Sequence, residues 1–157
     1  MLFVSTLKQQ LRDDLTTAMK ARDQLRSSTL RMVLTALTNA EVAGKEAIEL
    51  TDEQVLGVLS SEAKKRREAA VAFAAGGRAE AAAKEEAELG VILHYLPEQL
   101  DEAAVEALVN EVIDDLGVRG EGPRAMGRVM GALQPKVRGR ADGSMVAAKV
   151  KQLLGGS

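Results

Sequence analysis

The residues with the clearest capacity for chemistry are the arginines and glycines of residues 122–143, GPRAMGRVMGALQPKVRGRADG. The planar guanidinium of arginine presents several donors in a fork that matches phosphate oxygens. A glycine inside a helix costs about 1 kcal/mol relative to alanine, so Gly127 and Gly131 require a reason. One reason is the close approach of another backbone, of protein or of nucleic acid. The stretch therefore predicts a surface for a phosphate backbone.

The candidate nucleic-acid-binding residues extend from this stretch into the segment that follows. They are Arg124, Gly127, Arg128, Lys136, Arg138, Arg140, Lys149 and Lys151. Residues 117–157 carry a net charge of +6, whereas residues 97–116 carry seven acidic residues and no basic one. This segregation favours a polyanionic ligand whose affinity falls steeply with salt. The alternative is a basic, solvated face that only keeps a small domain soluble.

The three aromatic residues of the chain are Phe3, Phe73 and Tyr95, and none lies in the basic tail. Single-strand recognition usually stacks bases on aromatic rings, so the tail favours shape and backbone recognition of a folded RNA.

A second basic site is predicted at Lys64, Lys65, Arg66 and Arg67. Four successive helical residues span about 300°, so one of them must lie near the apolar stripe, either snorkelling or paired with an acid. Two interpretations stay open. The run contacts phosphate together with the tail, or it is a solvated face paired with Glu62 and Glu68.

Catalytic signatures are weak. The single histidine, His94, is interpreted as a packing residue at a domain junction, because acid–base work requires positioned partners. Ser61 and Lys64 match an S-x-x-K pattern, but the other motifs of serine acyl enzymes are missing. No phosphate-binding loop or metal-ligand spacing is found. We therefore expect no catalytic residue, no cofactor and no metal.

Composition favours an all-helical protein. The chain has 157 residues, no cysteine and only 2% aromatic residues, which is unusual for a β-sandwich or barrel. The lack of cysteine is compatible with a reducing cytosol. The chain has no apolar run of membrane-spanning length, and its N-terminus lacks the features of a signal peptide. These features predict a cytoplasmic location and no membrane partner.

Apolar residues at helical spacing predict seven helices. They run over residues 5–22 and 24–43, from Thr51 to Gly76, over residues 78–95, from Asp101 to Gly117, from Gly122-Pro123 through Val137, and from Asp142 to Gly155. The residue before a proline avoids helical geometry, so Leu96-Pro97 is the predicted boundary. We expect an N-terminal helical hairpin or four-helix unit (residues 1–96) and a small C-terminal three-helix domain (residues 97–157), which begins with a short linker at 97–100.

Several short motifs together resemble the YqeY family. They are Asp14 with Ala18-Met19-Lys20 and Asp23, Leu30-Arg31, KKRRE at residues 64–68, Gly77-Arg78, Lys84-Glu85, Tyr95-Leu96-Pro97-x-Gln99-Leu100, Met126-Gly127-x-Val129-Met130 and residues 139–143, GRADG. The match covers almost the whole chain in order. The last third is also similar to the tail domain of GatB, the subunit of the glutamine-dependent tRNA amidotransferase that holds the tRNA, and to a domain appended to some glutaminyl-tRNA synthetases.

The resemblance implies an all-helical two-part fold, contact with tRNA, and a family label of carbon–nitrogen ligase with glutamine as amido donor. No nucleophile, metal or ATP site in this chain supports that activity. The predicted function is therefore a non-catalytic, tRNA-binding accessory protein of translation. Its expected partners are tRNA and an aminoacyl-tRNA synthetase or amidotransferase. The alternative is a protein–protein adaptor that docks such an enzyme without binding RNA itself.

Overall fold

The computed structural model describes residues 5–155, and that part of the chain is all-helical, as the sequence predicts. The helices are α1 (Thr6–Lys20), α2 (Gln24–Glu41), α3 (Asp52–Ala75), α4 (Ala79–Leu93), α5 (Glu102–Leu116), the 3₁₀-helix η1 (Gly122–Ala125), α6 (Met126–Val137) and α7 (Gly143–Leu153). The chain forms two compact units, and the boundary between them lies between Leu96 and Pro97. In residues 5–155, no helix combines the length and the apolar character needed to cross a membrane.

Side-chain caps fix most helix starts, where the first backbone N–H groups lack helical acceptors. Thr51 accepts a hydrogen bond from the Gln54 amide at 3.2 Å, and the Gln54 side chain accepts from the Thr51 amide at 2.9 Å. This reciprocal capping box confirms the sequence prediction. Asp23, Asp101 and Asp142 each accept one backbone N–H at the start of α2, α5 and α7.

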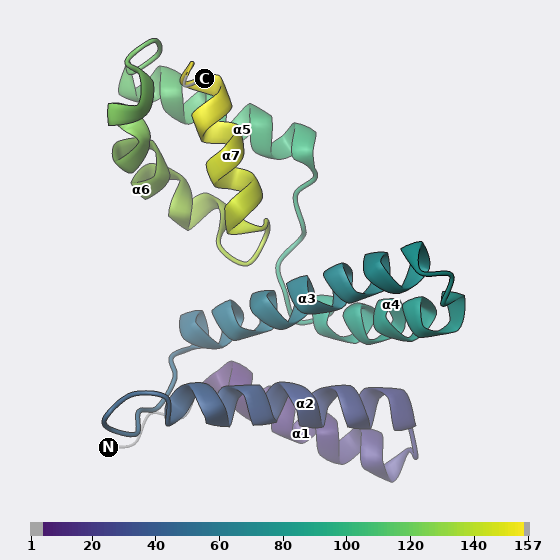
Figure 1. The fold of residues 1–157 in the computed structure, drawn as a ribbon. Helices are drawn as coiled ribbons and strands as arrows, with labels where there is room; N and C mark the ends of the chain where they lie inside the picture. Colours follow the sequence, from purple (N-terminus) through teal and green to yellow (C-terminus); the bar gives the residue numbers. More distant parts are fainter. Residues whose placement is uncertain (1–4, 156–157) are drawn as a thin grey trace. The chain divides into compact units, whose positions relative to one another are not determined.

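The first unit consists of two helical hairpins, α1–α2 and α3–α4 (Figure 1). Its core is aliphatic, with Tyr95 as its aromatic member, and is built around Leu11, Leu37 and Leu59. Polar links add to this core. Lys8 of α1 pairs with Glu41 of α2 at 2.7 Å, and both side chains are largely buried. A buried pair of this kind requires good geometry to offset the loss of hydration.

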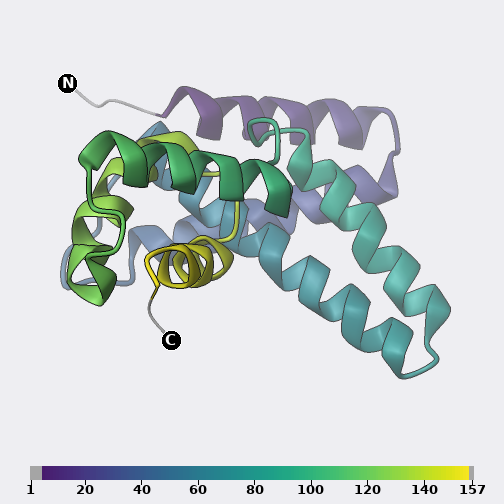
Figure 2. The ribbon, with the colours of Figure 1, turned by 90° about the horizontal axis from the view of Figure 1, so that it is seen from above.

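The α3–α4 hairpin is longer than α1–α2, and the turn that joins α3 and α4 projects beyond the ends of the other two helices (Figures 1 and 2). Gly76 follows the last helical residue of α3, and Gly77 takes a φ of 77°, which favours glycine. Arg78 lies over the ring of Phe73, with 4.8 Å between the guanidinium carbon and the ring centroid. The pair of glycines therefore ends one helix and lets the next begin.

The second unit is a three-helix bundle in which α5, α6 and α7 each contact the other two. Its core is entirely aliphatic, with Val109, Ile113, Leu133 and Val150 fully buried. Close packing of three short helices on one core buries the apolar stripe of each.

Residues 97–100 differ from the expected short linker, because they belong to the second unit. The Leu100 amide donates to the Arg140 carbonyl at 2.8 Å, and the Gln99 side chain donates to the Gly139 carbonyl at 2.8 Å. Leu100 also packs against the core of the bundle. Two segments about 40 residues apart are thus joined by backbone-directed hydrogen bonds, which local sequence rules do not reveal.

Candidate nucleic-acid interface

Helix α6 presents one apolar face and one exposed face. Val129, Leu133 and Val137 point into the core at spacings of four. The opposite face therefore carries Gly127, Gly131 and Pro135, also at spacings of four, and all three residues are exposed. Arg128 lies beside Gly127, and Arg124 precedes it in η1; both are exposed as well. We call Arg124, Gly127, Arg128, Gly131 and Pro135 the α6 ridge.

The two glycines of the ridge are not required by packing within the chain. A Cβ atom built at Gly127 or at Gly131 meets no other part of the described chain within 4 Å. Neither residue has the positive φ that would exclude an L side chain. Alanine would therefore fit both positions in this structure and would favour the helix. The bare backbone of the ridge is open to an external partner.

Pro135 adds a second backbone feature to the ridge. Proline has no amide hydrogen, so the Gly131 carbonyl lacks the donor that the residue four positions later normally supplies. Gly131 is exposed and has no side chain, so this unusual stretch of helix backbone lies at the surface. The ridge thus combines a carbonyl without its usual helical donor at its centre with cations at its start.

The predicted cations differ in what they contact. Arg124, Arg128 and Lys151 are exposed, and none makes an ion pair or a hydrogen bond within residues 5–155. They are available to an external anion. Arg138 is exposed in the turn after α6, where it already has a polar contact.

The other three cations serve contacts within the bundle. Lys149 is only 8% exposed and contacts two carboxylates of α5, Glu102 at 2.9 Å and Glu106 at 3.6 Å. The hydrogen bond to Glu102 raises the pKa of Lys149, so its charge is held. Lys136 lies 3.7 Å from Glu111. Arg140 donates to the carbonyls of Glu98 and Lys136, each at 3.1 Å, and so ties residues 97–100 to the end of α6.

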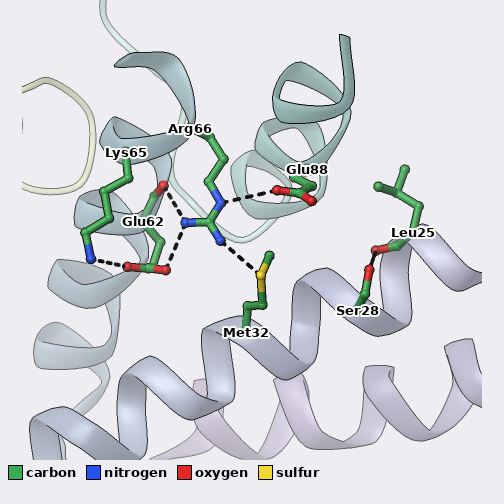
Figure 3. A network of polar contacts seen from close by, with 7 residues as sticks. All are labelled: Leu25, Ser28, Met32, Glu62, Lys65, Arg66 and Glu88. Atoms are coloured by element: carbon green, nitrogen blue, oxygen red, sulfur yellow. Dashed lines mark hydrogen bonds and ion pairs between the residues drawn. The ribbon is translucent and has the colours of Figure 1, made fainter. Parts of the chain in front are cut away.

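The second basic run, residues 64–67, is built into the first unit. Arg66 is the member that points inward, as helical geometry requires, and it pairs with Glu62 at 2.9 Å and with Glu88 at 3.6 Å (Figure 3). Lys65 pairs with Glu62 at 3.0 Å. Lys64 and Arg67 are half-buried and also have polar contacts. The run therefore serves internal ion pairs more than an open phosphate site.

His94 and Tyr95 lie at the end of α4. His94 is exposed, and its ring meets the Tyr95 ring edge-on at 5.2 Å, so it packs on one neighbour and is not buried. The Tyr95 hydroxyl donates to Asp14 of α1 at 2.5 Å. Burial raises the pKa of Tyr95, and the bond to Asp14 adds to the shift. Within residues 5–155, no three His, Cys, Asp or Glu side chains are placed to hold a metal ion.

Two compact helical units, the second of them a three-helix bundle, define the class as an all-helical protein. The family model described as "Yqey-like protein" matches residues 8–154. The chain therefore belongs to the YqeY family, as its motifs indicate.

Three fungal relatives have the same name, "Altered inheritance of mitochondria protein 41, mitochondrial". The Pyrenophora tritici-repentis protein is 27% identical over 93% of this chain and 80% of its own length. The Vanderwaltozyma polyspora protein is 29% identical over 68% and 60%. The protein of Saccharomyces cerevisiae strain YJM789 is 30% identical over 80% and 69%.

These names contradict the predicted cytoplasmic location, because each of the three relatives is called a mitochondrial protein. The prediction rested on missing cysteines and on a missing apolar span. Those features fit any reducing aqueous compartment and do not single out the cytoplasm.

Proposed function

We propose that the protein is a non-catalytic RNA-binding accessory factor that binds folded tRNA through the α6 ridge. The observation that carries the proposal is the coincidence of Arg124 and Arg128, both exposed and unpaired in the described chain, with two open glycines on one helix face. Arginine neutralises phosphates, and glycine lets the sugar-phosphate backbone approach the helix closely. The similarity of the last third to the tail domain of GatB supports the same ligand.

The Gly131 carbonyl favours RNA over DNA as the ligand. Its missing helical donor can be replaced by a ribose 2′-hydroxyl, which DNA does not possess. Phosphate contacts made by Arg124 and Arg128 fix the position of the backbone but read no base. The expected recognition is therefore by shape and sugar, with little dependence on sequence.

A binding titration of the full chain against bulk tRNA at several salt concentrations tests the proposal. The double variant Arg124→Glu with Arg128→Glu should weaken binding at least about tenfold, because two attractive phosphate contacts become repulsive. The alanine pair at the same positions should reduce the salt slope by about 2. A DNA hairpin of the same sequence should bind less tightly than the RNA hairpin.

The matched control is Arg12→Glu with Arg31→Glu, which changes the net charge equally on two exposed arginines of the first unit. It should leave tRNA affinity nearly unchanged. Equal losses in the two double variants would mean that net charge alone drives binding, and unchanged affinity in the ridge variant would refute the site. Co-purification of a synthetase or amidotransferase with no bound RNA would favour the adaptor function instead.

A further inference from the structure

The guanidinium of Arg66 is buried with its donors unevenly satisfied. Nη1 donates to Glu62 Oε1 at 2.9 Å. Nε lies 3.6 Å from Glu88 Oε2 but makes no hydrogen bond within residues 5–155. The acceptor that Nη2 finds in that range is the thioether sulfur of Met32 on α2, at 3.6 Å (Figure 3). A thioether is a weak acceptor, so one end of a buried cation is poorly matched.

Met32 is accessible although it contacts this buried group. The residue is 38% exposed on α2, so it borders the solvent, whereas Arg66 is 8% exposed. The chain has no cysteine, so its methionines are the only oxidisable sulfur. Met19 offers a natural comparison, because it is 50% exposed and has no polar partner within residues 5–155.

We propose that Met32 is an oxidation site whose sulfoxide is held by Arg66. The sulfur lone pair attacks the terminal oxygen of a hydroperoxide, an S–O bond forms and the O–O bond breaks. Sulfur loses two electrons, and the peroxide is reduced to water or an alcohol after it takes up the proton. The sulfoxide oxygen carries partial negative charge and accepts a hydrogen bond from Arg66 Nη2.

The existing geometry accommodates this product. A sulfoxide oxygen lies one bond beyond the sulfur, so it can reach hydrogen-bond distance from Nη2 across the present 3.6 Å with both helices in place. Methionine has three rotatable side-chain bonds, which allow the small adjustment. Oxidation usually disrupts apolar packing and destabilises a protein. Here it strengthens a link between α2 and α3, so the expected sign is opposite.

The test compares two variants of the full chain after treatment with hydrogen peroxide. Within residues 5–96, Met19→Leu leaves Met32 as the exposed methionine and Met32→Leu leaves Met19; all other methionines are common to both variants. Peptide mapping by mass spectrometry measures the sulfoxide at each position. For each variant, the unfolding temperature of the oxidised form is compared with that of its reduced form. At the same extent of oxidation, this shift should be roughly 4 °C more positive in Met19→Leu than in Met32→Leu. Methionine sulfoxide reductase should reverse the difference.

Glutamine variants provide a readout without peroxide, because the amide oxygen imitates the sulfoxide acceptor. Met32→Gln should unfold at a higher temperature than Met19→Gln. An equal or lower unfolding temperature for Met32→Gln, or oxidation of Met32 that lowers the unfolding temperature as much as oxidation of Met19, would overturn the proposal.

Discussion

The two units differ in how many charged residues they bury. The first unit buries Lys8, Glu62, Arg66 and Glu88 among its helices and pairs them with one another or with Glu41. The second unit has a wholly aliphatic core, and Lys149 is its one buried charge within the described chain. Buried pairs help to align neighbouring helices. We expect ligand binding on the second unit because its exposed, unpaired Arg124 and Arg128 adjoin the open glycines of the α6 ridge.

The alanine-rich sequence of α4 shows why the first unit uses buried charge. Residues 79–87, AEAAAKEEA, contain mostly alanine and glutamate, so they provide few large apolar side chains to pack against α3 in one defined alignment. The contact of Glu88 with Arg66 supplies a specific point of alignment between α3 and α4. In the second unit, branched aliphatic residues such as Val109 and Ile113 supply that specificity by shape.

The largest expected effect is the loss of the buried guanidinium. Arg66→Ala leaves the buried Glu88 without its cation and Glu62 with only the exposed Lys65, and should lower the free energy of unfolding by about 3–5 kcal/mol. Urea unfolding followed by circular dichroism measures this. The control Lys65→Ala removes an exposed partner of Glu62 and should cost less than about 1 kcal/mol. Similar losses in both variants would show that burial of the Arg66 charge is not what stabilises the first unit.

The ridge glycines should show opposite effects on stability and on binding. Gly131→Ala should raise the free energy of unfolding by about 1 kcal/mol, and Gly127→Ala, in the first turn of α6, by less. Both should weaken tRNA binding, because the added methyl group keeps the sugar-phosphate backbone away. Thermal unfolding and filter binding on the same samples measure the two quantities.

Matched controls for this pair exist in the first unit. Gly57 of α3 and Gly90 of α4 are also exposed and open within 4 Å. Alanine at these positions should stabilise the protein without changing tRNA affinity. Loss of affinity in all four variants would show that the α6 ridge has no special role.

A strained residue in the first unit predicts a smaller gain. Arg22 follows α1 with a φ of 57°, while the Asp23 amide donates to the Ala18 carbonyl at 2.9 Å. Glycine tolerates this left-handed geometry better than other residues. Arg22→Gly should therefore be more stable than Arg22→Ala by about 0.5–1 kcal/mol in urea unfolding. Equal stability of the two variants would show that the turn carries no strain.

The smallest effect is confined to alkaline pH. Burial and Asp14 raise the pKa of Tyr95 above its ordinary value of 10.0, so the folded state keeps the phenol proton more tightly than the unfolded state. The resulting stability is complete below pH 10 and is lost as the pH rises further. Tyr95→Phe should reduce this alkaline loss. Urea unfolding at pH 9, 10 and 11 measures the difference, and identical pH profiles would contradict it.

Much of the fold could be predicted because helix rules act locally. Apolar spacing gave the seven helices, and Thr51 and Gln54, only three residues apart, gave a capping box that the structure contains. The ridge could be predicted in part, since Gly127 and Arg128 stand out in the sequence. The place of Pro135 on the same face was not predicted, although its lack of an N–H was a usable signal.

The sequence by itself determined the helices, the YqeY family and the basic character of the tail. Tertiary structure alone decided which cations are available. Lys149 and Glu102 are 47 residues apart, and the packing of α7 on α5 brings them to 2.9 Å. Arg140 likewise donates a hydrogen bond to the Glu98 carbonyl, 42 residues away. Helical periodicity fixes the direction of a side chain, but only packing between helices supplies the partner that meets it.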